Sequence, residues 1–477
     1  MATSSAVSTL ASPKDPWAID ADGHVLEPPY ALPDYIDPKF RERAPRIVER
    51  DGQEYWEGDA WLRYTATNTG SSSAAPATAL PGCAGIMRWN QSEYSGRTMP
   101  PYSKANPAAF NPAARLKVMD EERFDAAFLY PTLGLTFIPD IEYSRALNRA
   151  YNDWLADYCK ADRGRLYGIA AVNLADVDSA VAELRRCIKT HGFKGVFLRP
   201  GIYIADTNWW DEVYDPFWSA CEELDVPVGF HPFSVDRMRG AGAYFGLDQN
   251  RPVQSFLRAP FVHPVDSMFV VGSMICGGVL ERHPRLRVGI LEASGGWIVP
   301  FLERLDHRFE HLGHTMPDQM KMKPSDYFRR QCWISFDPEE VTLELTARVI
   351  GADRIIIGSD FPHPDAFYPN FVDLLLKAVG PERAAAGANP ARRGPAILQG
   401  VTQPEPFSVL EAAPEGPVVV SPAPHEAGSQ AQFPWFEATF RTLLTLRCDT
   451  VVFRPWALGR LVLAPVPGST RMIAIIP

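Results

Sequence analysis

The sequence predicts a (β/α)8 barrel of the α/β class, in which eight parallel strands alternate with helices. Two observations carry this prediction. Eight short apolar runs are mostly continuous rather than alternating, which is typical of strands covered on both faces. Amphipathic helical stretches lie between most of these runs, as the barrel requires. The 477 residues, 46% of them hydrophobic, suffice for one large barrel or two ordinary domains.

The predicted strands are rich in β-branched and aromatic residues. They span residues 17–25, 125–131, 166–174, 192–200, 226–232, 286–294, 332–337 and 354–360. The clearest helix covers 176–192, where apolar residues recur on one stripe and Gly192 is the expected C-terminal stop. Further helices are predicted over 143–162, 215–225 and 299–312.

Three regions fall outside the repeat. Residues 1–15 are predicted to be a disordered lead, and residues 16–398 the barrel. Within the barrel, residues 45–110 contain a Gly/Ser/Ala/Pro-rich stretch after the first strand, and we expect a partly ordered cap over the barrel mouth. Residues 399–477 are rich in Pro and form an atypical C-terminal extension, for which a small β-type appendage, a dimer-swapping arm and a poorly ordered chain are all open.

Composition excludes several classes of protein. The 47 Lys and Arg against 57 Asp and Glu give a net charge of -10, which argues against a nucleic-acid surface. The seven cysteines are scattered and never form a CxxC pair, so neither a disulfide framework nor a thiolate zinc site is expected. The N-terminus lacks the features of a signal peptide, and no stretch approaches the roughly 18 uncharged apolar residues of a membrane span. We therefore expect a cytoplasmic protein without a membrane or nucleic-acid partner.

Most predicted strands end in a polar or charged residue. In this kind of barrel the active site lies at the C-terminal ends of the strands. These residues are Asp22 and His24 after the first strand, Arg199 after the fourth, His231 after the fifth, Glu292 after the sixth, Asp337 after the seventh and Asp360 after the eighth.

Four of these residues are predicted to bind a metal. Asp22 and His24 are two apart in an extended segment and point to the same side. With His231 and Asp360 they offer two imidazoles and two carboxylates, a suitable shell for one divalent transition metal. Each residue alone has a simpler interpretation, since His231 could be a core histidine and Asp360 could start a turn. Their convergence at the strand ends of one architecture favours the metal site.

The same segments resemble the amidohydrolase superfamily, and more narrowly the branch related to aminocarboxymuconate-semialdehyde decarboxylase. The resemblance rests on DADGHVLEP, FLRP, FHPF, GGVLERHPRLRVGILEASGGW and GSDFPHPD, and it extends from about residue 17 to 392. It implies a barrel of the metal-dependent hydrolase type with Asp22, His24, His231 and Asp360 at the ligand positions, and a homodimer. The expected metal is zinc, with manganese as the alternative. Many decarboxylases of the branch carry a proton-handling histidine after the sixth strand, where this chain has Glu292.

Further residues have predicted catalytic or substrate-binding roles. Asp360 is the predicted acid or base, and Glu292 is a second candidate. His363 could hydrogen-bond the substrate or a developing oxyanion, or be an ordinary loop histidine. Arg199 suits a substrate carboxylate, with a structural ion pair as the alternative. His263 is a candidate substrate-binding residue just before a helix that opens at Pro264, or a packed loop histidine.

These observations predict a metal-dependent hydrolase or carboxy-lyase (decarboxylase) that acts on a small cyclic or aromatic carboxylic acid. The two reactions differ in whether water or the substrate carboxylate takes the open metal position. The alternative from another class is a barrel without catalytic activity that serves as a binding or scaffolding protein.

Overall fold

The computed structural model describes residues 18–58, 77, 82–89, 100–135, 138, 140–233, 240–245 and 252–379, and four short segments near the C-terminus, 418–420, 451–453, 462–465 and 472–475. The side chains of 243, 245, 252–255, 258, 379 and the four C-terminal segments are not described. The predicted disordered lead, 1–15, lies outside the described residues. The chain divides into two compact units, residues 1–402 and 403–477.

The first unit is built on one sheet of eight parallel strands, whose order β1-β4-β5-β6-β7-β8-β9-β10 follows the chain. After the last strand, Asp360 N–H donates to Asp22 O at 3.0 Å, and His24 N–H donates to Phe361 O at 2.8 Å. These bonds join the two ends of the sheet, so the predicted (β/α)8 barrel is confirmed. The strands are β1 (Ala18–His24), β4 (Phe124–Tyr130), β5 (Leu166–Ala171), β6 (Gly195–Leu198), β7 (Val228–Phe230), β8 (Val288–Ile290), β9 (Cys332–Phe336) and β10 (Ile355–Ile357).

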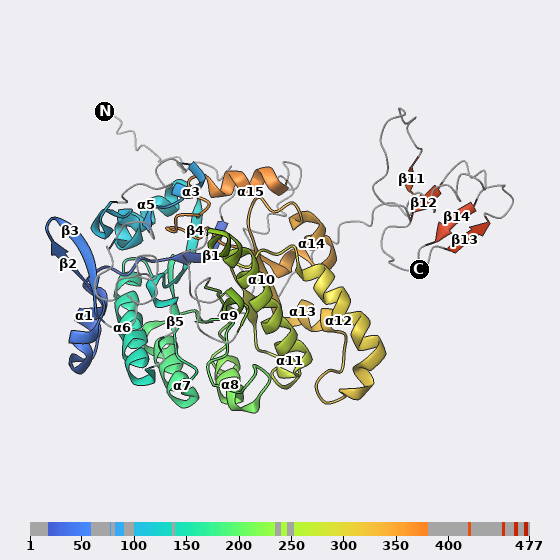
Figure 1. Cartoon of the computed structure of the whole chain (residues 1–477), viewed down its shortest axis with the longest axis horizontal. Coiled ribbons are helices and arrows are strands. Elements are labelled where there is room, and N and C mark those ends of the chain that lie inside the picture. Colours follow the sequence, from blue (N-terminus) through green and yellow to red (C-terminus); the bar gives the residue numbers. More distant parts are fainter. Residues whose placement is uncertain are drawn as a thin grey trace, which may run out of the picture. The chain divides into compact units, whose positions relative to one another are not determined.

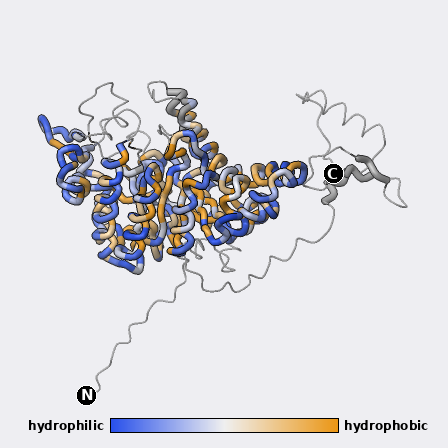
Figure 2. Tube along the Cα trace, turned by 90° about the horizontal axis from the view of Figure 1, so that it is seen from below, coloured by the Kyte–Doolittle hydropathy of each residue, from blue (hydrophilic) through white to orange (hydrophobic). Residues whose placement is uncertain are grey.

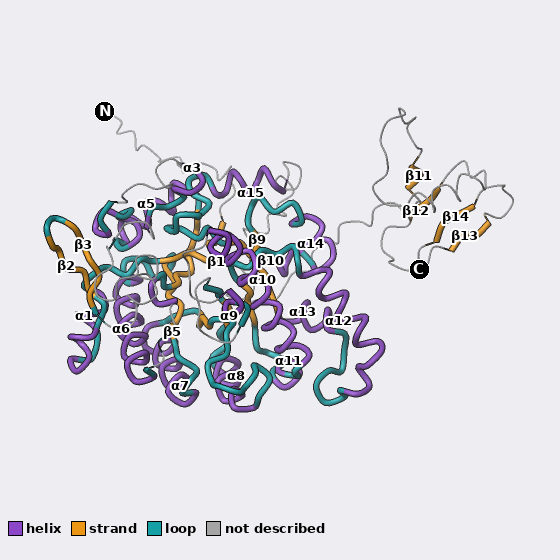
Figure 3. Tube along the Cα trace, in the orientation of Figure 1, coloured by secondary structure: helices purple, strands orange, loops and turns teal. Residues whose placement is uncertain are grey.

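Helices form the outer layer around these strands (Figure 1; Figure 3). The predicted helix after β5 continues through a π-helical turn at Cys187–His191 and ends at Gly192 with φ 76°. The helices that follow β4 are α6 (Ile141–Cys159), α7 (Val177–Arg186), α8 (Asp215–Glu223), α9 (Gly242–Phe245), α10 (Pro252–Cys276), α11 (Val279–Arg282), α12 (Ile298–Leu312), α13 (Pro324–Gln331), α14 (Leu343–Ile350) and α15 (Phe371–Val379).

The segment between β1 and β4 is longer than the other connections. It begins with α1 (Ala31–Tyr35) and an antiparallel hairpin of β2 (Arg46–Arg50) and β3 (Gln53–Glu57), and it ends with α3 (Ile86–Trp89) and α5 (Pro112–Glu122). Residues 59–76, 78–81 and 90–99 of the predicted cap lie outside the described residues. The described part reaches the loop after β10, because Gly85 N–H donates to His363 O at 3.0 Å and Met87 N–H donates to Pro364 O at 2.8 Å.

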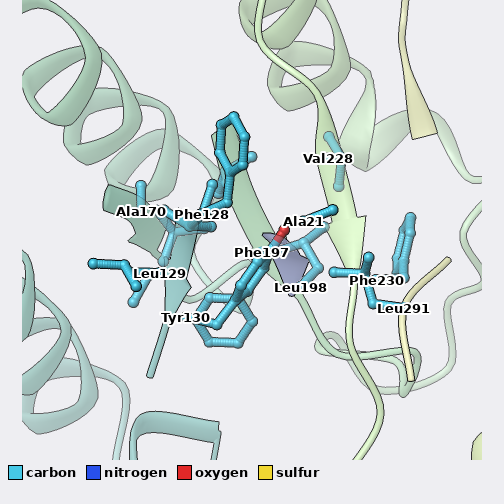
Figure 4. Close-up of a cluster of buried hydrophobic side chains, with 14 of the residues drawn as sticks. Ala21, Phe128, Leu129, Tyr130, Ala170, Phe197, Leu198, Val228, Phe230 and Leu291 are labelled. Carbon is cyan, nitrogen blue, oxygen red and sulfur yellow. The ribbon is translucent and has the colours of Figure 1, made fainter. Parts of the chain in front are cut away.

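The interior of the barrel is filled by side chains (Figure 4). The rings of Tyr130 and Phe197 lie edge to face with centroids 6.4 Å apart, beside small residues such as Gly195 and Gly229. Tyr130, Gly195 and Gly229 help to line an internal void of about 10 Å³, which has room for one water at most. Apolar segments alternate with polar ones along the tube of the first unit (Figure 2), as expected for elements with one buried face. The centre of the barrel is therefore a packed core rather than an open cavity.

The helix α10 differs from its prediction. We expected a helix that opens at Pro264, but α10 begins at Pro252 and contains both Pro260 and Pro264, so His263 lies within a helix. Its stretch Ala259–Cys276 is long and apolar enough to cross a membrane by composition, and 39% of that stretch is buried in the structure. A single helix of this kind is weak evidence of a membrane span, since core helices of soluble proteins can be equally long and apolar.

The second unit contains two small antiparallel pairings among its described residues. The strand β11 (Val418–Val420) pairs with β12 (Val451–Phe453), and β13 (Val462–Pro465) pairs with β14 (Met472–Ile475).

Candidate metal centre

The end of β1 carries two of the predicted ligands. Asp22 and His24 are both buried, and the His24 side chain has no exposed surface. They point to the same side, and Asp22 Oδ1 lies 3.6 Å from His24 Nε2. A glycine on the neighbouring strand end allows this arrangement, because a Cβ at Gly358 would lie 2.3 Å from Asp22 Cβ.

The other two predicted ligands come from two further strand ends, His231 from β7 on the opposite side of the barrel and Asp360 from β10 beside β1. His231 directly follows β7, and its Nε2 lies 3.1 Å from His24 Nε2 and 3.6 Å from Asp22 Oδ1. Asp360 follows β10, and its Oδ1 lies 3.5 Å from His24 Nε2. The structure thus brings all four residues together, with their ligand atoms within a few ångströms of one another.

Both imidazoles are oriented by backbone carbonyls. His24 Nδ1 contacts Pro131 O at 2.9 Å, and His231 Nδ1 contacts Pro232 O at 2.8 Å. A carbonyl can only accept, so each Nδ1 carries the hydrogen and each Nε2 of the neutral ring presents a lone pair. Two lone pairs that face each other at 3.1 Å cannot form a hydrogen bond with one another. This arrangement is the one by which proteins orient metal-binding histidines.

The charges of the centre call for a cation. Burial lowers the pKa of His231 to about 3 and that of His24 well below its ordinary value, so both rings are neutral. Burial, and then the nearby Asp360, raises the pKa of Asp22 well above its usual range. Among the described residues, Asp22 Oδ1 is buried without a hydrogen-bond partner. A buried carboxylate is costly unless it is paired or coordinates a metal, so these residues fit a divalent metal ion.

His363 lies next to Asp360, the last of the four residues, and the two side chains form a close pair. Thr132 Oγ1 donates to Val25 O at 2.7 Å, so it must accept from His363 Nε2, which lies 2.9 Å away. In the neutral ring His363 Nδ1 is then an acceptor, and it lies 2.5 Å from Asp360 Oδ1 in a short contact that is poorly aligned for a hydrogen bond. Burial, and then Asp365, raises the pKa of Asp360 well above its usual range, while burial lowers that of His363. In the metal-free centre these shifts favour a protonated Asp360 carboxyl beside a neutral His363 ring.

Glu292 reaches the same group of atoms from the end of β8. Its Oε2 lies 3.3 Å from His231 Nε2, and burial, followed by the charge of Asp360, raises its pKa well above the ordinary value. Its backbone has φ 39°, and Asp360 has φ 56°. Such values are rare for residues other than glycine and cluster at functional sites.

His263 lies behind Glu292. Its Nδ1 donates to the backbone carbonyl of Glu292 at 3.0 Å, and burial lowers its pKa to about 4. Its role as a substrate-binding residue stays a prediction, and this hydrogen bond links it to the loop that carries Glu292.

Arg199 is buried at the end of β6, only 3% exposed. Its guanidinium carbon lies 5.6 Å from the centre of the Tyr203 ring, and its backbone N–H donates to the Tyr203 hydroxyl at 3.2 Å. A role in binding a substrate carboxylate also stays a prediction.

Several residues of the centre were missed or undervalued in the sequence. Glu340 accepts from the backbone N–H groups of Gly295, Gly296 and Asp337, at 2.9–3.2 Å for its nearer oxygens, and so fixes the loop that follows Glu292. Burial, and then the charge of Glu340, raises the pKa of Asp337 to about 7. Only the position of Asp337 at a strand end was a signal in the sequence, since Glu340 is typical of an exposed helix start.

Comparison with known proteins agrees with this centre and this fold. The sequence profile of the family described as amidohydrolase matches residues 19–392. The chain is 30% identical to gamma-resorcylate decarboxylase of Rhizobium radiobacter over 289 residues, which is 58% of this chain and 85% of that protein. It is 29% identical to gamma-resorcylate decarboxylase of Rhodococcus jostii over 261 residues, 52% of this chain and 76% of the other.

A solved structure extends the comparison to most of the first unit. The amidohydrolase from Mycobacterium avium subsp. paratuberculosis has a TM-score of 0.63 and 25% identity, and the match covers 81% of this chain and 98% of that one. A family profile that spans most of the chain, a barrel of the same architecture and ligand-type residues at its strand ends all agree. The chain belongs to the amidohydrolase family.

Proposed function

We propose that the chain is a metal-dependent carboxy-lyase that removes CO₂ from a small aromatic carboxylic acid. One observation carries the proposal: the neutral imidazoles of His24 and His231 and the carboxyl groups of Asp22 and Asp360 converge at the barrel mouth, and His363 lies beside Asp360 as a further group that can carry a proton. The names of the relatives point to the same reaction, since the proteins of Rhizobium radiobacter and Rhodococcus jostii are both decarboxylases.

The proposed ligands are Asp22, His24, His231 and Asp360. Two nitrogen and two carboxylate donors suit zinc or manganese and leave positions for the substrate. When bound, a divalent metal supplies Lewis acidity to the substrate carboxylate and an adjacent oxygen. Arg199 follows β6 and Glu292 follows β8, and Glu292 Oε2 lies 3.3 Å from His231 Nε2. We assign Arg199 the substrate carboxylate as its partner, because a guanidinium matches a carboxylate in two parallel hydrogen bonds.

The proton for the reaction comes from Asp360 and His363. Decarboxylation joins a proton to the ring carbon and breaks that carbon's bond to the carboxylate, whose electron pair stays on the ring, so an aromatic acid anion and a proton give the arene and CO₂. We assign the proton to the Asp360–His363 pair: burial raises the pKa of Asp360 in the metal-free centre, and His363 would hold the proton once Asp360 is a metal ligand. His363, held by Thr132, then returns a proton to the pair from solvent.

The test loads the purified protein with zinc or with manganese and measures CO₂ release from a panel of hydroxybenzoic acids. Asp360→Asn is expected to lower kcat by about 10²–10⁴-fold, the usual worth of a positioned acid, and also to weaken metal binding because Asp360 is a proposed ligand. His231→Ala is expected to lose the metal. Asp353→Asn is the control, because that carboxylate is 54% exposed and pairs with Arg354.

The outcomes separate the alternatives. Hydrolysis of cyclic amides or esters without CO₂ release would replace the lyase with a hydrolase at the same centre. A protein that binds metal but converts neither class of substrate would favour a binding protein. A wild-type protein that takes up no divalent metal would contradict the proposed centre.

A further inference from the structure

We propose that Asp20, Arg115 and Ser359 are positioning residues that set the geometry of the metal centre from behind. This Asp20–Arg115–Ser359 cluster joins the ends of β1 and β10, the two strands that carry Asp22, His24 and Asp360. The inference rests on the proposed function, because it concerns how the proposed ligands are held.

The first half of the cluster ties β10 to β1. The Asp20 carboxylate accepts from the Ser359 backbone N–H at 2.9 Å and from the Ser359 hydroxyl at 2.7 Å, using one oxygen for each. Ser359 Oγ in turn accepts from Phe361 N–H at 3.0 Å. The residues on both sides of Asp360 are thus bound, directly or through Ser359, to a side chain of β1.

The second half comes from α5, which lies outside the strand repeat. Arg115 Nη1 donates to His24 O at 2.9 Å and to Phe361 O at 3.3 Å, so one guanidinium holds a backbone group on each strand end. Arg115 Nη2 lies 3.5 Å from Asp20 Oδ2, which balances the buried positive charge. The guanidinium carbon also lies 4.6 Å from the centre of the Phe361 ring.

The cluster is buried and closely packed. Asp20, Arg115 and Ser359 are 1%, 2% and 2% exposed. A Cβ at Gly23 would lie 2.6 Å from Arg115 Nη2 and from Asp20 Oδ2, so glycine between the two ligands of β1 leaves room for the ion pair. A buried charged network of this kind is costly to assemble unless its charges are paired and hydrogen-bonded, as those of Asp20 and Arg115 are.

The position of the cluster relates it to the metal centre rather than to the core in general. Its hydrogen bonds end on the residue before Asp360, the residue after it and the carbonyl of His24. The separation of Asp22 and His24 from Asp360 therefore depends on these bonds. Outer partners that orient ligands in this way typically change metal affinity by about 10- to 100-fold when they are removed.

The decisive variant is Ser359→Ala, with Ser325→Ala as a matched control. Ser325 donates its N–H to Asp306 Oδ1 at 2.8 Å and its hydroxyl to Asp306 Oδ2 at 2.6 Å, the same motif as that of Ser359 with Asp20, and it is 6% exposed. Ser325 lies in α13 and Asp306 in α12, outside the strand ends. The two variants thus remove the same bond in two places.

The measurement is the Kd for Zn²⁺ or Mn²⁺, from competition with a metal-binding dye, beside urea unfolding of the metal-free proteins. Ser359→Ala is expected to raise the Kd by about 10-fold or more, whereas Ser325→Ala leaves it unchanged at a similar loss of stability. Arg115→Lys is expected to raise the Kd as well, because lysine keeps the charge but cannot reach both carbonyls with one planar group.

Each outcome decides whether the Asp20–Arg115–Ser359 cluster sets the affinity for the metal. A Ser359→Ala protein with the wild-type Kd contradicts the proposal, as does an equal rise for Ser325→Ala, which would mean a general effect of stability. A wild-type protein that binds no divalent metal contradicts the proposed function itself and is thereby distinguished from a failure of the Asp20–Arg115–Ser359 cluster alone.

Discussion

At the scale of single residues, the role of each histidine follows from which of its ring nitrogens carries the hydrogen and which keeps a lone pair. His24 and His231 donate their Nδ1 hydrogens to backbone carbonyls, so their Nε2 atoms keep free lone pairs. His363 donates its Nε2 hydrogen to Thr132, and its Nδ1 lone pair faces Asp360. The first two rings, which are fully buried, are therefore suited to a metal, and the third, which is only partly buried, is suited to a proton.

Glu27 is a buried carboxylate three residues after His24. Its hydrogen bonds are to backbone N–H groups and not to the proposed metal ligands. It accepts from the backbone N–H groups of Leu133 and Gly134, both at 3.0 Å, yet burial outweighs these bonds and raises its pKa from 4.5 to about 7. A raised pKa in the folded state means that the folded protein holds this proton more tightly than the unfolded chain. The stability from this site is present below pH 4.5 and is lost as the pH rises through about 7.

We therefore predict that the advantage of the wild type over Glu27→Gln in unfolding free energy shrinks by about 3 kcal/mol between pH 4.5 and pH 8. Urea unfolding of both metal-free proteins at the two pH values measures it. The comparison cancels the opposite trend from His24 and His231, which are present in both proteins and whose lowered pKa values cost stability as the pH falls. Parallel pH profiles for the two proteins would show that Glu27 is charged when folded.

At the scale of elements, the strands could be predicted from the sequence, but the side chains from other elements that hydrogen-bond to the strand ends and the loops after them could not. The eight apolar runs are local patterns, and Asp22 and His24 follow from the two-residue period of a strand. Arg115 is 91 residues from His24 and 246 from Phe361, so no local pattern indicates its two hydrogen bonds. The same holds for Thr132, which is 231 residues from His363. Pro264 was mistaken for a helix start because proline is typical there, whereas α10 continues through it.

Two glycines in neighbouring elements should respond in opposite ways to alanine. A Cβ at Gly295, between β8 and α12, would lie 1.8 Å from a ring carbon of Phe336, whereas at Gly272 within α10 the nearest atom is Phe301 Cζ at 3.6 Å. Gly295→Ala is expected to lower the unfolding free energy by about 1–3 kcal/mol through overpacking. Gly272→Ala is expected to raise it by about 0.5–1 kcal/mol, since alanine favours a helix.

Urea unfolding of the two variants and the wild type checks this pair. Gly295→Ala should also weaken metal binding, because it displaces the N–H groups that hold Glu340 and with them the loop of Glu292. A Gly295→Ala protein as stable as the wild type would mean that Phe336 moves freely, which the close packing around β9 argues against.

At the scale of the whole molecule, all the residues assigned to the centre lie in the first unit. The four proposed ligands, the Asp360–His363 pair and the Asp20–Arg115–Ser359 cluster fall between residues 20 and 363, within residues 1–402, and the family profile ends at residue 392. The chemistry should therefore be a property of the first unit.

We predict that a chain of residues 1–402 keeps the metal Kd and the kcat/KM of the full chain. The barrel closes through bonds between the ends of β1 and β10, both of which this chain retains. A chain that ends at residue 350 is the control, because it lacks β10 and Asp360 and should lose both properties. Metal titration, circular dichroism and CO₂ release on the three proteins decide the matter. If residues 1–402 fold and bind metal but release no CO₂, the second unit takes part in turnover, and the centre described here is complete as a metal site but not as an active site.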